Sequence, residues 1–292
     1  MRKIVPAVAL AVAGLAAAGP AASLASASPS GAGDYRSDRA CEQESRFGNL
    51  TVVGLTDRGR LVCTSEDRPG RARDIGRVRG LQGDVALVGI DFRPATGDLY
   101  GVGNAGGVYT IDTATARATK VATMDVALSG TNFGVDFNPT VDRLRVVSDN
   151  GQNLRINVDT GATLVDSALN TAGVVTTGVT GAAYTNNDAS PDTATSLFDI
   201  DSSLDQVAIQ APPNAGGLNP TGKLGYDAAP TVGFDIFSGV RDGVARANKA
   251  LASLVVDGRA RLYEIDPLTG QADFNGSFDR DVAVVDIAIP LA

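Results

Sequence analysis

The segment GVDFNPTVDRLRVV, residues 134–147, repeats the segment GIDFRPATGDLYGV, residues 89–102, which lies forty-five positions earlier. The two segments share glycine, aspartate, phenylalanine, proline, leucine and valine without a gap. The segments VGFDIFS (232–238) and VVDIAIP (284–290) carry the same apolar-Asp-apolar core, and TGAAYTNN (180–187) stands where a further copy is due. The chain therefore contains five copies of one unit.

The architecture follows from what surrounds each copy. After each copy come short runs rich in Val, Ile, Thr and Leu, which glycine-containing turns separate. This pattern predicts four strands per unit and an all-β fold built of β-propeller blades. Residues 50–84 supply later strands without an opening one, whereas residues 284–290 form an opening strand with nothing behind it. We therefore expect five four-stranded blades, with the C-terminal strand completing the first blade and removing exposed edges. An open β-solenoid is the structural alternative.

A hairpin at Asn150-Gly151 sets the strand register of the central copy, because glycine supplies the positive φ that such a turn needs. This register places Arg145 opposite Arg155, with Asp136 in the same row on the neighbouring strand. Two facing arginines repel, so the carboxylate of Asp136 is expected to provide their counter-charge.

The repeated aspartate allows three interpretations. In the first, the four carboxylates are structural and hydrogen-bond each blade to its neighbours. In the second, they converge on the central channel and bind a hard cation such as calcium, although Ala183 occupies the fifth place. In the third, Arg145 and Arg155 hold an anionic ligand. The predicted metal ligands are Asp91, Asp136, Asp235 and Asp286.

The N-terminus has the features of an export signal. Arg2 and Lys3 precede an apolar stretch, and small residues follow up to Ala27, which predicts a signal peptide over 1–27 and a secreted protein. We assign 28–46 to an N-terminal arm and 47–292 to a single propeller domain, with no membrane span. Loss of the two cations takes the formal charge from -8 to -10, which argues against nucleic acid and favours neutral or cationic ligands.

Cysteine and histidine usage limits the chemistry. Cys41 and Cys63 are expected to form a disulfide in an oxidising compartment. Histidine is absent, which excludes Ser-His-Asp and Cys-His catalysis and any imidazole metal ligand.

Loop length indicates where a ligand could bind. The turns between first and second strands lengthen in the last two full copies, at 186–194 and 238–249, and elaborated loops on a rigid scaffold often carry binding sites. Drift of surface loops is the alternative explanation. With the charged row, the candidate ligand-binding residues are Asp136, Arg145, Arg155, Asn186, Asn187, Asp188, Arg241 and Asp242.

The segment DFNPTVDRLRVVSDNGQNLRINVDTG (136–161), with QAPPNAG (210–216), resembles the bacterial family called domain of unknown function 4394. The likeness covers roughly residues 50–290. It implies a secreted, propeller-like domain and no particular activity or catalytic residue.

Two functions remain open. We expect a non-enzymatic binding or interaction module, because the chain offers no nucleophile beside a base, and we expect it to act as a monomer on an extracellular ligand or protein. The alternative is a calcium-dependent propeller hydrolase acting on a small neutral or cationic substrate. We expect no cofactor for the binding module, and calcium is the candidate cofactor of the hydrolase.

Overall fold

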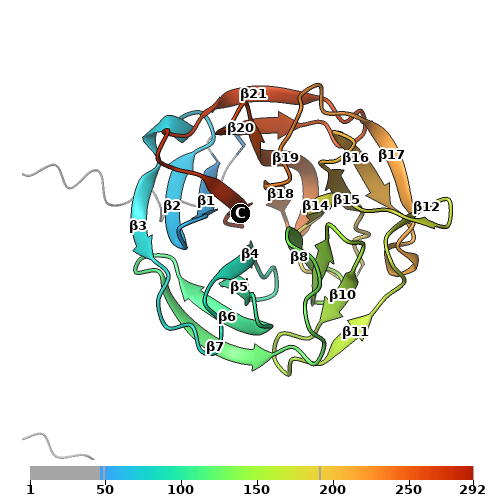
Figure 1. Ribbon diagram of the computed structural model, residues 1–292, viewed down its shortest axis with the longest axis horizontal. Coiled ribbons are helices and arrows are strands. Elements are labelled where there is room, and N and C mark those ends of the chain that lie inside the picture. The colour runs from blue at the N-terminus through green and yellow to red at the C-terminus, as the bar shows by residue number, and fades with distance from the viewer. Residues whose placement is uncertain (1–46, 49, 191, 292) are drawn as a thin grey trace, which may run out of the picture. The chain divides into compact units, whose positions relative to one another are not determined.

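The computed structural model describes residues 47–48, 50–190 and 192–291, which form a ring of five four-stranded antiparallel sheets (Figure 1). The predicted all-β propeller with five blades is therefore confirmed. The expected signal peptide, 1–27, and N-terminal arm, 28–46, lie outside the described residues. Within the described ranges, no helix has the length and apolar character needed to cross a membrane.

The blades follow one another around the ring, and each has its four strands in order from the inner to the outer. Blade 1 contains β22 (Val284–Ala288), β1 (Thr51–Thr56), β2 (Arg60–Ser65) and β3 (Arg73–Arg77). Blade 2 contains β4 (Leu87–Phe92), β5 (Leu99–Gly103), β6 (Gly107–Asp112) and β7 (Arg117–Thr123). Blade 3 contains β8 (Phe133–Asn138), β9 (Arg143–Ser148), β10 (Asn153–Ile156) and β11 (Thr163–Val165). Blade 4 contains β14 (Val179–Tyr184), β15 (Leu197–Asp201), β16 (Gln206–Gln210) and β17 (Leu218–Lys223). Blade 5 contains β18 (Val232–Arg241), β19 (Val244–Val256), β20 (Arg259–Ile265) and β21 (Ala272–Ser277).

Smaller elements lie outside the blades. β12 (Asn170–Thr171) and β13 (Val174–Val175) form a two-stranded hairpin in the connection between blades 3 and 4. The 3-10 helices η1 (Pro69–Arg71) and η2 (Pro213–Ala215) occupy the turns before the outer strands of blades 1 and 4.

The C-terminal strand closes the ring. β22 pairs with β1 in antiparallel register, with Val53 opposite Ala288 and Gly54 opposite Ile287. The predicted completion of blade 1 by the C-terminal strand is confirmed, and the open solenoid is wrong. Pairing β22 with β1 covers the inner edge of β1 and joins the last described strand to the first, which closes the ring.

The predicted register of blade 3 is also confirmed. Gly151 has a φ of 89°, and Arg145 lies opposite both Arg155 and Asp136 in the sheet. A hairpin of fixed loop length determines which residues face one another, so this much could be deduced from the sequence.

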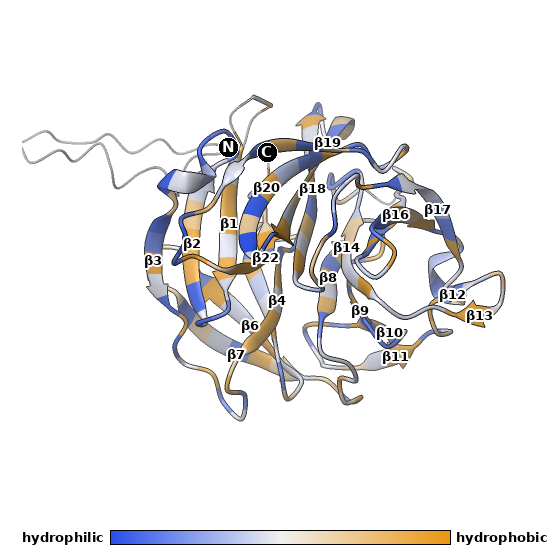
Figure 2. Ribbon diagram, turned by 45° about the horizontal axis from the view of Figure 1, so that its top comes forward, coloured by the Kyte–Doolittle hydropathy of each residue, from blue (hydrophilic) through white to orange (hydrophobic). Residues whose placement is uncertain are grey.

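The core consists of apolar clusters, and each fills the seam between two neighbouring blades. Inner and middle strands are largely buried, whereas outer strands such as β3 are partly exposed, and Figure 2 shows the corresponding change from hydrophobic to hydrophilic residues. Among the described residues, the seam between blades 3 and 4 has the smallest apolar cluster. That seam buries the charged side chain of Arg145 instead.

Glycines allow the inner strands to approach closely at the centre. A Cβ atom on Gly134 would lie 2.5 Å from the backbone nitrogen of Ala182 in the next blade. A Cβ atom on Gly233 would likewise lie 2.6 Å from the backbone nitrogen of Ile287. At Gly134 and Gly233, two positions before Asp136 and Asp235, close contact between neighbouring backbones therefore requires glycine.

Candidate functional site

The four repeated aspartates fasten the blades together. Each carboxylate accepts a hydrogen bond from a backbone N–H of the following blade, at distances from 2.6 to 3.0 Å. The pairs are Asp286 with Ile90, Asp91 with Phe137, Asp136 with Tyr184, and Asp235 with Ile289. The structural interpretation of these aspartates is confirmed at four of the five seams.

At the fifth seam, between blades 4 and 5, Ala183 replaces the aspartate and the long turn after β14 provides the bonds. Asn186 exchanges two hydrogen bonds with Asn248, of 3.0 and 2.8 Å. Asn187 donates to Ser238 Oγ and to the Ile236 carbonyl oxygen, each at 2.9 Å. These predicted ligand-binding residues thus bind the neighbouring hairpin.

Asp188 completes this seam, because its Oδ2 atom accepts a 2.9 Å hydrogen bond from the backbone N–H of Ala245. The other two candidates in these loops, Arg241 and Asp242, lie at the tip of the β18–β19 hairpin with side chains more than 80% exposed and an ion-pair distance of 3.8 Å.

Three of the four repeated aspartates also form a carboxylate cluster on the ring axis. One oxygen each from Asp91, Asp136 and Asp235 lies within 4.8 Å of the others, and all three side chains are buried. At this distance and an effective dielectric constant of about 20, two full charges repel by roughly 3 kcal/mol. Simultaneous ionisation is therefore strongly disfavoured unless a cation lies between them.

The pKa values of the cluster reflect this environment. Burial, and then the neighbouring carboxylates, raise the pKa of Asp91 and Asp136 well above the ordinary value. Burial raises the pKa of Asp235 to about 7 and the pKa of Asp286 well above its usual range. Carboxylate oxygens are the ligands that calcium prefers, so the cluster is suited either to protons or to a hard cation.

Arg145 is the centre of a buried polar network between blades 3 and 4, although its partner is not the predicted Asp136. Its guanidinium donates to Asp166 Oδ2 at 2.7 Å and to Asn153 Oδ1 at 2.6 Å. Asp166 also accepts two hydrogen bonds from Arg155, of 2.7 and 2.8 Å, and so compensates the facing arginines.

Two further contacts occupy the Arg145 guanidinium, which donates to the Tyr184 hydroxyl at 3.2 Å and to Asn214 Oδ1 at 3.0 Å. The side chain is only 1% exposed. A pair of arginines open to an anionic ligand, the third interpretation of the charged row, does not match this geometry.

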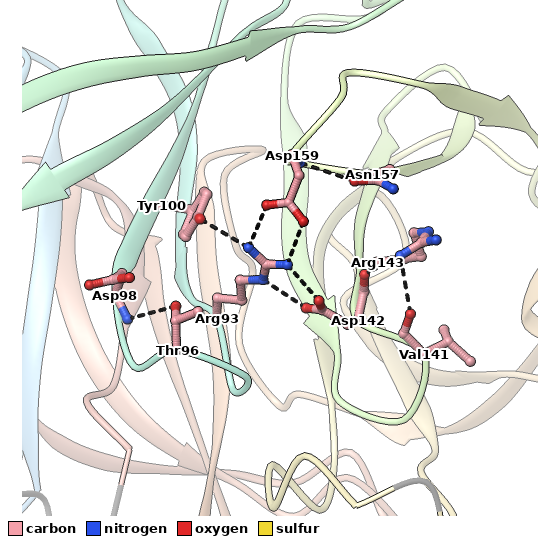
Figure 3. Close-up of polar contacts among 9 residues, drawn as sticks. All are labelled: Arg93, Thr96, Asp98, Tyr100, Val141, Asp142, Arg143, Asn157 and Asp159. Atoms are coloured by element: carbon pink, nitrogen blue, oxygen red, sulfur yellow. Dashed lines mark hydrogen bonds and ion pairs between the residues drawn. The ribbon is translucent and has the colours of Figure 1, made fainter.

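Sequence reasoning missed a second arginine network, centred on Arg93 between blades 2 and 3 (Figure 3). Its guanidinium makes paired hydrogen bonds to Asp142, of 2.8 and 2.5 Å, and to Asp159, of 2.8 and 3.0 Å. A fifth bond reaches the Tyr100 hydroxyl at 3.1 Å, so the donors of the guanidinium are engaged on every side. The available signal was the position after the repeated Asp-Phe, where Arg93 replaces the Asn138 of the next copy.

The predicted disulfide involves one described residue. Cys63 is buried in β2, whereas Cys41 lies outside the described residues. The bond remains a prediction, which titration of free thiols in the denatured, unreduced protein would check.

A cavity of about 220 Å³ opens where the inner strands begin, at one mouth of the central channel. Every blade contributes to its lining: Thr56, Asp57 and Val285 from blade 1, Ala86 and Val88 from blade 2, Thr131 and Asn132 from blade 3, Thr180 from blade 4, and Thr231 from blade 5. The buried carboxylate cluster lies further along the same inner strands. Sequence reasoning missed this mouth, because residues so far apart converge only after the ring closes.

The polar groups of the mouth are held in place by their own hydrogen bonds. Asp149 accepts bonds from the backbone N–H groups of Thr131 and Asn132, at 2.9 and 3.0 Å. The Asn132 side-chain amide also donates to Asp149 at 3.1 Å, and Thr180 Oγ1 donates to Ser202 Oγ at 3.1 Å. Because these side chains are already ordered, binding a ligand costs less of their conformational entropy.

Comparisons with solved structures give distant likenesses. A chain of the nidogen–laminin complex is 11% identical, with a TM-score of 0.49 over 84% of this chain and 99% of the other. A structural genomics protein of unknown function from Bacteroides thetaiotaomicron is 16% identical, with a TM-score of 0.45 over 85% of this chain and 66% of the other. An auxiliary nutrient binding protein from Bacteroides ovatus is 16% identical, with a TM-score of 0.37 over 58% of this chain, which spans 46% of that protein's length.

A comparison with curated proteins gives no match. The family model described as domain of unknown function (DUF4394) matches residues 60–288, which include strands of all five blades and the four repeated aspartates. The resemblance seen in the sequence is thus confirmed, and the chain belongs to the DUF4394 family.

Proposed function

We propose that this protein is a secreted, non-enzymatic binding module whose ligand enters the channel mouth. The observation that carries this proposal is the 220 Å³ cavity lined by all five blades. Ligand sites favour concave surfaces where a few polar groups converge on a rigid scaffold, and the mouth has this character.

The lining indicates the chemistry of the ligand. Threonine hydroxyls and the Asn132 amide can exchange hydrogen bonds, and Asp57 is the one charged residue among the lining residues. A carboxylate in a site lined otherwise by neutral groups favours a cation over an anion. The ligand class that fits is a small, polar, neutral or cationic molecule.

A calcium-dependent hydrolase is the second candidate, and the axial carboxylate cluster is the observation that favours it. These carboxylates are at most 6% exposed, and they hold backbone N–H groups of neighbouring blades. A cation bound there would stabilise the ring, whereas a catalytic cation needs an open position for substrate or water. The geometry therefore supports binding better than hydrolysis.

The experiment screens neutral sugars, amino acids and small amines by thermal shift, followed by calorimetry on any compound that raises the melting temperature. Thr231→Phe, which narrows the mouth, should abolish the shift, and Thr171→Phe on the exposed β12–β13 hairpin is the matched control. A ligand that binds both variants and the wild type equally well would place its site elsewhere.

A further inference from the structure

A second cavity, of about 570 Å³, lies along the seam between blades 1 and 2. Three arginines, Arg58, Arg77 and Arg79, line it. The cavity adjoins the channel mouth, because Asp57, Gly59, Ala86 and Leu87 line both spaces. A concentration of guanidinium groups is unexpected in a chain with a formal charge of -8.

The backbone holds the three arginines in a fixed relation. Arg77 and Arg79 flank Val78, which is buried in the apolar cluster between blades 1 and 2, so extended backbone directs both guanidinium groups away from the core. The Val78 N–H donates to the carbonyl oxygen of Gly59 at 2.8 Å, which ties this segment to the turn that carries Arg58. Arg79 also pairs through its backbone with Ala116 and Ala118 of blade 2, at 3.2 and 2.8 Å.

These three guanidinium groups have no protein partner in the described part of the chain. The neighbouring Arg60 forms an ion pair with Asp74, whereas the side chains of Arg58, Arg77 and Arg79 form no ion pair or hydrogen bond with a described residue. All three arginines are exposed, so their guanidinium N–H groups can donate hydrogen bonds to an anion that enters the cavity.

Two carboxylates line the same cavity, and one of them is already engaged. Asp84 is buried and accepts hydrogen bonds from the Tyr109 hydroxyl at 2.5 Å and from the Ala105 N–H. Asp57 stands at the junction with the channel mouth. The arginines therefore keep free donors for a ligand, and planar guanidinium groups match the paired oxygens of phosphate, sulfate or carboxylate.

We propose that Arg58, Arg77 and Arg79 form a binding site for the oxyanion group of a small soluble ligand. The site is separate from the proposed mouth site and does not depend on it. A ligand long enough to reach both spaces would present its anionic group to the arginines and its neutral or cationic part to Asp57.

The test is calorimetric titration with inorganic phosphate, sulfate and citrate, each at constant ionic strength so that general screening does not change. We expect saturable binding of at least one anion by the wild type. The double variant Arg77→Ala/Arg79→Ala should weaken that binding by about tenfold or more, since each lost charge-assisted hydrogen bond removes a substantial part of the affinity. Arg77→Lys/Arg79→Lys should retain part of the affinity, because charge remains and paired geometry is lost.

Arg246→Ala, at an exposed arginine on the long hairpin of blade 5, is the control and should bind the anion as the wild type does. Thr231→Phe should also leave anion binding unchanged, which separates this site from the channel mouth. Absence of saturable binding to all three anions, or equal affinity in the wild type and the double alanine variant, would overturn the proposal.

Discussion

The Oδ2 atom of Asp286 accepts a 2.7 Å hydrogen bond from the backbone N–H of Ile90, a residue 196 positions earlier in the chain. Asp286 belongs to the C-terminal strand of blade 1, and Ile90 belongs to the inner strand of blade 2. The last strand of the chain therefore completes one sheet and also fastens that sheet to the next. Because of this double role, we expect the ring to depend on the C-terminal strand.

Deletion of residues 284–292 should abolish the cooperative melt or leave the protein insoluble. The deletion exposes the inner edge of β1 and removes Val284, Ile287 and Ile289 from the apolar cluster between blades 5 and 1. Apolar burial contributes about 25 cal/mol per Å², so uncovering a few hundred Å² consumes much of a typical stability of about 5–15 kcal/mol. Calorimetry of the truncated protein is the measurement, and a soluble, cooperatively melting product would contradict the closed ring.

Asp286→Ala should lower the free energy of unfolding by about 2–4 kcal/mol while preserving the fold. The substitution leaves the buried N–H groups of Ile90 and Ile287 without their acceptor. Urea denaturation measures the loss, and Asp281→Ala, at an exposed position before the same strand, should change stability little. Equal stability of the two variants would show that the carboxylate does not fasten the blades.

The melting temperature should fall as the pH rises from about 4 to about 7. Burial raises the pKa of Asp235 to about 7, above the value of an unfolded aspartate, so its contribution to stability is complete below about pH 4 and is lost as the pH rises through the folded pKa. Exposed aspartates with lowered pKa values, such as Asp159 and Asp266, also stabilise the fold. Their contribution is lost only at a pH below this range, where acid protonates them. The pKa values of Asp91, Asp136 and Asp286 are raised in the same direction as that of Asp235.

Melting curves between pH 4 and 8, with EDTA and with added calcium, test this dependence. If the carboxylates are protonated, the melting temperature in EDTA should fall as the pH rises. If calcium binds on the axis, the melting temperature should instead rise with pH when calcium is present. A melting temperature that rises with pH even in EDTA would contradict a protonated cluster.

Arg145→Ala should destabilise the protein by about 3 kcal/mol, because it leaves Asn153 Oδ1 and Asn214 Oδ1 without this donor and opens a gap inside the seam, while Asp166 keeps Arg155 as its cationic partner. Arg155→Ala should cost less, since the Arg155 side chain is 25% exposed and Asp166 retains Arg145. Chemical denaturation of the two variants side by side gives the comparison. A larger loss for Arg155→Ala would mean that Arg145 is not the centre of the network.

The repeat pattern alone specifies the number of blades, their closure and the register within blade 3. These properties follow from local rules: the repeat places the strands, the Asn150-Gly151 turn fixes which residues face one another, and complementary ends predict how the ring closes. The pattern also places Asp91, Asp136, Asp235 and Asp286 in one row around the axis, because equivalent positions in repeated units occupy equivalent places in a ring.

The partners of the charged side chains, by contrast, are settled only when the blades come together. The strand register places Asp136 beside Arg145, but the long Arg145 side chain extends beyond this row and contacts Asp166 and Asn214. These two residues lie in loops of blades 3 and 4 that meet at the same seam. Arg93 likewise crosses to two aspartates of the next blade.

The arginine-lined cavity has the same origin. The net negative charge favoured neutral or cationic ligands, yet folding gathers Arg58, Arg77 and Arg79 around one cavity between blades 1 and 2. Contacts between blades depend on side-chain length and on loops from distant parts of the chain, and local sequence patterns do not encode that convergence.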